Sequence, residues 1–155
     1  MVGVEIEKAV KATMAPSLAK EHFNRGVTYL ELGEYRKAIQ EYDKAIQLDP
    51  NYDDVYNNRG IAYRKLGEYQ QAIQEYDKAI QLDPNYAYAY YNRGIAYWHL
   101  SQYELAIKDY DKAIQLDPNY AGAYQNRGVA YRDMGKNERG IEDFDKACSL
   151  DKQFC

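Results

Sequence analysis

The sequence predicts an all-α protein built from tandem pairs of helices. Two observations lead to this prediction: a 34-residue pattern recurs along the chain, and each copy holds two helical stretches separated by glycine or proline. The string DKAIQLDPNY starts at Asp43, Asp77 and Asp111, so successive starts are 34 residues apart. A repeat of this length indicates a stack of supersecondary units. We divide the chain into residues 19–52, 53–86, 87–120 and 121–154, called units one to four, preceded by residues 1–18.

Each unit is expected to fold as helix, turn, helix, turn. In unit two, one apolar stripe runs from Tyr56 to Tyr63 and ends near Gly67, where glycine can terminate a helix. The second helix ends before Pro84, because proline cannot continue a helix and disfavours helical geometry in the residue before it. We expect Gly60 to let the two helix axes approach closely, with tyrosine rings filling the flanking volume.

These units resemble tetratricopeptide repeats. The resemblance covers residues 19–154 and implies a right-handed superhelix of stacked helix pairs, in which the first helix of each pair lines a concave groove. In that family the groove holds a peptide or a partner protein. The chain departs from the family pattern at His22, which stands at an aromatic place, and at Lys152, which stands where the last proline is expected. In unit two the matching residues are Tyr56, Arg59-Gly60, Tyr63, Ala72, Tyr76, Ala79 and Pro84.

The two ends of the chain carry separate expectations. Val2, Ile6, Val10 and Met14 are spaced by four residues, which predicts a short amphipathic helix that ends before Pro16. Residues 1–18 are interpreted as a cap on unit one or as the remnant of an earlier unit. At the other end nothing covers unit four, so we expect an exposed apolar patch that favours end-to-end association of two copies.

Unit three carries the strongest candidate for partner binding. The second, fifth, sixth, ninth, twelfth and thirteenth places of each unit lie outside the core stripe and are expected to face the groove. Only two of the 18 tyrosines stand at places where tyrosine does not recur, and both are in this set, together with the single tryptophan. Tyrosine and tryptophan are favoured contact residues; the alternative is that this aromatic stripe belongs to the core. The residues concerned are Tyr88, Tyr91, Asn92, Ile95, Trp98 and His99.

Polar residues of the groove allow two interpretations each. Asparagine recurs at the sixth place although it is a mediocre helix former. A row of amides can hold an extended peptide, because an amide both donates and accepts hydrogen bonds; alternatively each amide ties its helix to a neighbouring helix. Arg64, Lys65 and Arg132 are predicted to attract an acidic segment, with solvated surface charge as the alternative. The asparagines are Asn24, Asn58, Asn92 and Asn126.

An arginine precedes the helix-crossing glycine in every unit, as in Arg59-Gly60. Its recurrence beside recurring acids indicates structural ion pairs rather than a site. The arginines are Arg25, Arg59, Arg93 and Arg127, and the acids are Asp43, Asp77, Asp111 and Asp145.

The two cysteines, Cys148 and Cys155, are too few for a disulfide framework or a four-ligand zinc site. We expect reduced thiols, since residues seven apart in a continuous helix lie about 10 Å apart along its axis. A disulfide requires the chain to turn after Leu150, and it would point to an oxidising compartment.

Composition and motifs disfavour several classes of function. The net charge of −4 and the lack of a basic stripe disfavour nucleic acid as a partner. No apolar run approaches the roughly 18 residues of a membrane span. With no secretion signal, a cytoplasmic location is expected, or a periplasmic or exported one if a signal peptide has been removed. The chain lacks a phosphate-binding loop, a catalytic set and a metal-ligand cluster, so no enzyme activity, cofactor or metal is predicted.

The predicted function is a non-catalytic interaction module or scaffold that binds a peptide or protein segment in the groove. The alternative is a self-assembling structural protein that uses its terminal units or residues 1–18. Relatives that bind chaperones use a carboxylate clamp, but the corresponding places of unit one hold Phe23 and Val27. Recognition of a chaperone's terminal carboxylate is therefore not expected.

Overall fold

The computed structural model describes residues 2–155; from Thr13 onward side chains are described throughout, and before it only those of Val4 and Glu5. The described chain is all-helical and contains no strand. Units one and two contain α1 (Val2–Glu31), α2 (Tyr35–Leu48), α3 (Asp53–Lys65) and α4 (Tyr69–Leu82). Units three and four contain α5 (Ala87–His99), α6 (Tyr103–Leu116), α7 (Ala121–Asp133) and α8 (Asn137–Leu150), followed by the 3₁₀ helix η1 (Lys152–Phe154).

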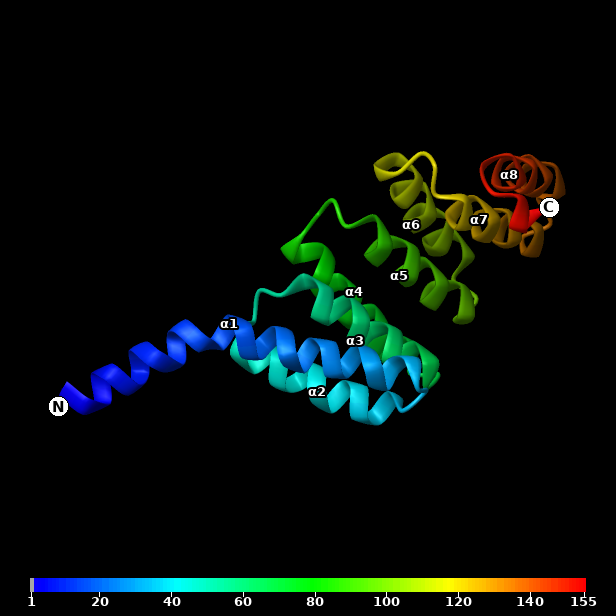
Figure 1. Cartoon of the computed structure of the whole chain (residues 1–155). Helices are drawn as coiled ribbons and strands as arrows, with labels where there is room; N and C mark the ends of the chain where they lie inside the picture. The colour runs from blue at the N-terminus through cyan, green and yellow to red at the C-terminus, as the bar shows by residue number, and fades with distance from the viewer. Residues whose placement is uncertain (1) are drawn as a thin grey trace.

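The helices form one antiparallel pair per unit, and the pairs stack into a superhelix (Figure 1). Each helix packs against the next one along the chain. The first helices of neighbouring units also contact one another, as α3 does α5 and α5 does α7, whereas the second helices of neighbouring units make no comparable contact in the described part of the chain. The first helices therefore lie on the inside of the curve, and we call their shared surface the inner face.

Close crossing of the two helices in each pair depends on glycine opposite an aromatic ring. A Cβ atom built on Gly94 would lie 2.6 Å from Cε1 of Tyr110, and one on Gly60 would lie 2.6 Å from Cε1 of Tyr76. Both tyrosine rings are buried, so the expected pairing of a small residue with a large one is confirmed. The remaining core is mostly alanine, which leaves little other bulk between the axes.

Glycine and aspartate end the helices. Gly67 has a φ of +78°, and the chain turns there so that the N–H of Glu68 reaches the carbonyl of Tyr63 at 2.9 Å. After the second helix, Asp83 leaves helical geometry and its Oδ1 accepts the N–H of Asn85 at 2.9 Å. Asp49, Asp117 and Asp151 accept the equivalent hydrogen bond.

The predicted helix end before Pro16 is wrong. α1 continues through Pro16 to Glu31, so residues 2–18 and the first helix of unit one form one element. Proline removes a backbone donor at a cost of about 3 kcal/mol, and the helix can continue where packing of the rest of the element offsets that cost. The N-terminal part of α1 projects beyond the stacked pairs (Figure 1), with Met14 exposed. Val2, Ile6 and Val10 lie outside the described side chains, and the capping role of residues 1–18 stays a prediction.

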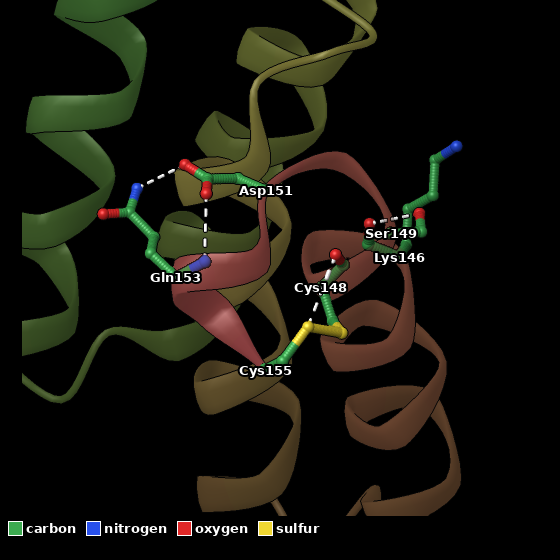
Figure 2. Close-up of a disulfide and its surroundings, with 6 residues drawn as sticks. All are labelled: Lys146, Cys148, Ser149, Asp151, Gln153 and Cys155. Carbon is green, nitrogen blue, oxygen red and sulfur yellow. Dashed lines mark hydrogen bonds between the residues drawn. A yellow bond between two sulfur atoms is a disulfide. The ribbon is translucent and has the colours of Figure 1, made fainter.

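The expected reduced thiols are also wrong. α8 ends at Leu150, Asp151 adopts an extended conformation, and η1 returns the chain so that Cys155 forms a disulfide with Cys148 (Figure 2). The Cα atoms of the two cysteines are 4.7 Å apart. The turn after Leu150 that the pairing requires is therefore present, and it fixes the C-terminal tail against α8.

Candidate functional site

The candidate site is a pocket on the inner face, between α5 and α7. Its volume is about 150 Å³. α5 supplies most of one wall, α7 supplies the other, and a tyrosine of α6 closes it from beneath. The lining residues are Ile95, Trp98, His99, Tyr110, Asn126 and Val129.

The indole of Trp98 is held in place by the next unit. Its Nε1 donates a hydrogen bond of 2.8 Å to Oδ2 of Asp133, and its edge meets the ring of His99. His99 in turn stacks on Tyr69, with ring centroids 4.5 Å apart. Burial and the nearby charge of Arg64 lower the pKa of His99, so the imidazole is mainly neutral at pH 7. The apolar wall of the pocket is thus preorganised and uncharged.

Tyr88 and Tyr91, the two tyrosines at places where tyrosine does not recur, have different surroundings. Tyr91 is half-buried; its ring centroid lies 4.7 Å from that of Tyr120, and its hydroxyl accepts a hydrogen bond of 3.1 Å from Asn126. Tyr91 therefore helps to join α5 to α7. Tyr88 is 61% exposed and rests against Tyr120, with ring centroids 5.2 Å apart. Of the two, Tyr88 offers the larger free surface.

The asparagine row links neighbouring first helices. Asn92 is buried, and its amide donates to Oδ1 of Asn57 in the preceding unit at 3.1 Å. Asn126 donates to Tyr91, which occupies the same place in its unit as Asn57 does. The N–H₂ groups of Asn92 and Asn126 therefore tie their helices to a neighbouring helix, which is the second of the two interpretations given above. Of the other two, Asn24 is exposed, and Asn58 is half-buried and accepts from Asn57.

A positive charge without a matching carboxylate lies beside the pocket. Arg64 is half-buried, and no described carboxylate lies within ion-pairing distance of it. Its Nε is buried without a hydrogen-bond partner in the described part of the chain. The positive charge of Arg64 is close enough to His99 to help lower the pKa of its imidazole. Lys65 and Arg132 are exposed, and Arg132 lies 3.9 Å from Asp133.

Three of the four recurring arginines form the ion pairs expected from the sequence, each with a second acid in addition. Arg25 instead pairs with Glu21 and lies 4.0 Å from Glu41, and Asp145 makes no ion pair with a described residue. Arg93 Nη1 lies 2.5 Å from Oδ1 of Asp77 in the preceding unit, and Nη2 lies 2.7 Å from Oδ1 of Asp109 in its own unit. Arg59 and Arg127 repeat the arrangement. Sequence reasoning missed the second acid because its identity changes from glutamate in units one and two to aspartate in units three and four; the signal was an acidic residue at the same place in every unit. These acids are Glu41, Glu75, Asp109 and Asp143.

The described residues contain no group of three or more histidine, cysteine, aspartate or glutamate side chains that could hold a metal ion. Among the described helices, none is both long enough and apolar enough to cross a membrane.

Comparison with known proteins supports the repeat assignment. Sequence models described as TPR repeat match residues 26–67 and 61–101, and models described as tetratricopeptide repeat match residues 87–120 and 109–142. None of the curated proteins compared with the chain matches it.

Solved structures of helical repeat proteins match most of the chain. A crystal structure of MamA is 31% identical, with a TM-score of 0.81, over 95% of this chain and 85% of that one. The first TPR of Spaghetti (RPAP3), bound to the HSP90 peptide SRMEEVD, is 29% identical, with a TM-score of 0.75, over 77% of this chain and 95% of that one. PilF of Pseudomonas aeruginosa is 25% identical, with a TM-score of 0.83, over 89% of this chain and 63% of that one.

Proposed function

Because the chain belongs to the tetratricopeptide repeat family, a family of protein-interaction modules, we propose that it binds a peptide or protein segment on its inner face without catalysing a reaction. The observation that carries this proposal is the pocket between α5 and α7. It combines an indole fixed by Asp133 with two aliphatic side chains, Ile95 and Val129. Preformed apolar pockets with a few polar groups are the usual form of a binding site.

The pocket is suited to one apolar side chain of the partner. A cavity of about 150 Å³ accommodates a ligand the size of benzene. The ninth place of every unit is aliphatic and half-buried, so an apolar row crosses the whole inner face. We propose that an extended segment follows this row, with an acidic residue beside the unpaired charge of Arg64. The row consists of Val27, Ile61, Ile95 and Val129.

Trp98 makes the proposal testable, since it is the only tryptophan and its fluorescence reports on the pocket. A peptide selected from a random library for binding to the intact chain should change that emission on titration. In anisotropy measurements with the labelled peptide, Trp98→Ala should weaken binding by about 30-fold, the effect of losing a hot-spot residue. The control Leu105→Ala removes an exposed apolar side chain from α6, outside the inner face, and should leave affinity unchanged. Equal affinity for wild type and a folded Trp98→Ala variant would refute the proposal.

One observation favours self-association as a second function. Ile141 is 58% exposed, whereas Ile73 at the same place of unit two is 7% exposed beneath the next unit. At the opposite end, Glu21 and Thr28 stand where unit two buries Val55 and an alanine, so these two places of the unit-one face are polar. We propose that two copies meet through their unit-four ends. Sedimentation velocity should reveal a concentration-dependent dimer that Ile141→Glu abolishes; a monomer at all concentrations would contradict this.

The disulfide supports the exported location over the cytoplasmic one, because disulfides persist mainly in oxidising compartments. Thiol labelling of the chain in the source cell, before and after reduction, tests this. Cysteines that react with the label without prior reduction would favour the cytoplasm.

A further inference from the structure

A second pocket lies at the opposite end of α5 from Trp98. Its volume is about 460 Å³, and the C-terminal tail, from the end of α8 through η1, supplies one wall. Tyr88 and Tyr91 of α5 and Tyr120 before α7 contribute aromatic rings, and Asp117 and Asp151 contribute carboxylates. None of the residues that line it is basic. Neither the C-terminal tail nor these two aspartates line the pocket beside Trp98.

Elsewhere in the chain, tyrosine rings and paired carboxylates surround the guanidinium groups of arginines. The guanidinium of Arg93 lies 5.5 Å from the ring centroid of Tyr90 and pairs with Asp77 and Asp109. The other internal arginines repeat this: Arg127 lies 5.4 Å from the ring of Tyr124 and Arg59 lies 5.6 Å from that of Tyr56, each with two carboxylates. In each of these three cases the guanidinium stacks on a tyrosine ring and pairs with two carboxylates. The second pocket offers tyrosines and two acids but contains no arginine.

We infer that this pocket binds the guanidinium of an arginine side chain carried by the partner segment. Stacking on aromatic faces and pairing with carboxylates are the interactions that distinguish arginine from lysine. The inference rests on the proposed function only for the source of the arginine, since the pocket is built from this chain alone.

Both carboxylates retain acceptor capacity for such a ligand. Asp117 Oδ1 accepts the N–H of Asn119, and Asp151 accepts from the backbone and side chain of Gln153. A carboxylate offers about four acceptor sites, so each still has lone pairs to spare. Burial raises the pKa of Tyr120, and the neighbouring Tyr91, Tyr88 and Asp117 raise it further.

The disulfide holds the wall that carries Asp151. Figure 2 shows the bond between Cys148 and Cys155 on one side of η1, with Asp151 and Gln153 on the other. Reduction removes the only covalent link between the tail and α8 apart from the backbone itself. We therefore expect the arginine site to depend on the oxidised state.

The experiment uses N-acetyl-arginine amide, titrated into the intact oxidised chain and followed by amide chemical shifts in NMR. Saturable shifts are expected at Tyr88, Tyr120 and Asp151, with a millimolar dissociation constant. N-acetyl-citrulline amide has nearly the same shape without the charge and should bind at least about fivefold more weakly. N-acetyl-lysine amide should also bind more weakly. The double variant Cys148→Ser/Cys155→Ser should lose most of the affinity.

A matched pair of variants separates the site from general electrostatics. Asp117→Asn keeps the hydrogen bond to Asn119 but removes the charge, and should weaken arginine binding several-fold. Asp83→Asn makes the same change in the equivalent turn of unit two, where Asp83 accepts from Asn85, and should have no effect. Equal effects of the two variants, equal binding of citrulline or lysine, or undiminished binding to the cysteine variant would each overturn the inference. Because the arginine probe does not need Trp98, failure here is distinguishable from failure of the groove proposal.

Discussion

Substitution of Gly94 by alanine tests whether the close crossing of α5 and α6 determines the stability of unit three. The added Cβ would lie 2.6 Å from Cε1 and 2.9 Å from Cδ1 of Tyr110. That ring is buried and packs between α5, α6 and α7, with the inner-face pocket on one side of it. The helices must separate or the ring must leave its rotamer.

Two opposing effects set the magnitude. In an exposed helix, replacing glycine by alanine stabilises by about 1 kcal/mol. Forcing an extra carbon into a packed core costs about 1–3 kcal/mol, and an approach this short places the cost near the upper end. We therefore expect a net loss of about 2 kcal/mol, opposite in sign to the helix-propensity effect.

Urea unfolding followed by circular dichroism measures the loss, and hydrogen exchange of α5 and α6 shows whether it is local, because repeat arrays can unfold in steps. Gly122→Ala is the control: its Cβ would lie 3.3 Å from the hydroxyl oxygen of Tyr91, the far end of a side chain, so a shift of a few tenths of an ångström accommodates it. The control should change stability by less than about 0.5 kcal/mol. An unchanged or increased stability of Gly94→Ala would refute the packing argument.

Three further predictions follow from burial, charge and the disulfide. Ile73→Ala should cost about 2–4 kcal/mol in urea unfolding, whereas Ile141→Ala at the same repeat place should cost less than about 0.5 kcal/mol, and equal losses would contradict the difference in burial. Arg93→Met should cost about 3 kcal/mol at pH 7, because it leaves the buried carboxylate of Asp109 without its counter-ion. Burial already raises the pKa of the Asp109 carboxyl above its unfolded value. The cost of burying the unpaired carboxylate therefore applies above the folded pKa and should shrink as acid protonates the group. A loss of stability that does not change with pH would disprove this. Reduction of the disulfide should cost at most about 2.5 kcal/mol, the loop-closure value for so short a loop, and should speed hydrogen exchange at the end of α8 while leaving α5 unchanged.

The repeated elements were predictable because their determinants are local. Gly67 and Pro84 mark helix ends through backbone preferences that act within a few residues. The 34-residue period then showed which small and large residues share a place, so a close crossing at Gly60 with tyrosine rings beside it followed from the pattern; that the ring of Tyr76 lies directly opposite Gly60 came from the structure. The first acid of each arginine pair was found in the same way.

The remaining features depend on context that the local signals do not contain. Pro16 normally ends a helix, but here the element continues. The cysteines lie too far apart within a helix, and only the end of α8 at Leu150, with Lys152 in place of proline, brings them together. The partner of Asn92 lies 35 residues away in the preceding unit, so it is fixed only once the units are stacked.

Contacts between first helices connect the candidate site to the stacking of the units. Trp98 donates to Asp133, Asn92 to Asn57 and Asn126 to Tyr91, and each pair is separated by 35 residues. The side chains that hold adjacent units together thus share the inner face with the pocket. A segment seated against Trp98 would contact α5 and α7 at once and would oppose their separation. Binding at the pocket is therefore expected to stabilise the stacked arrangement of the units, by an amount that grows with the logarithm of the ligand concentration above Kd.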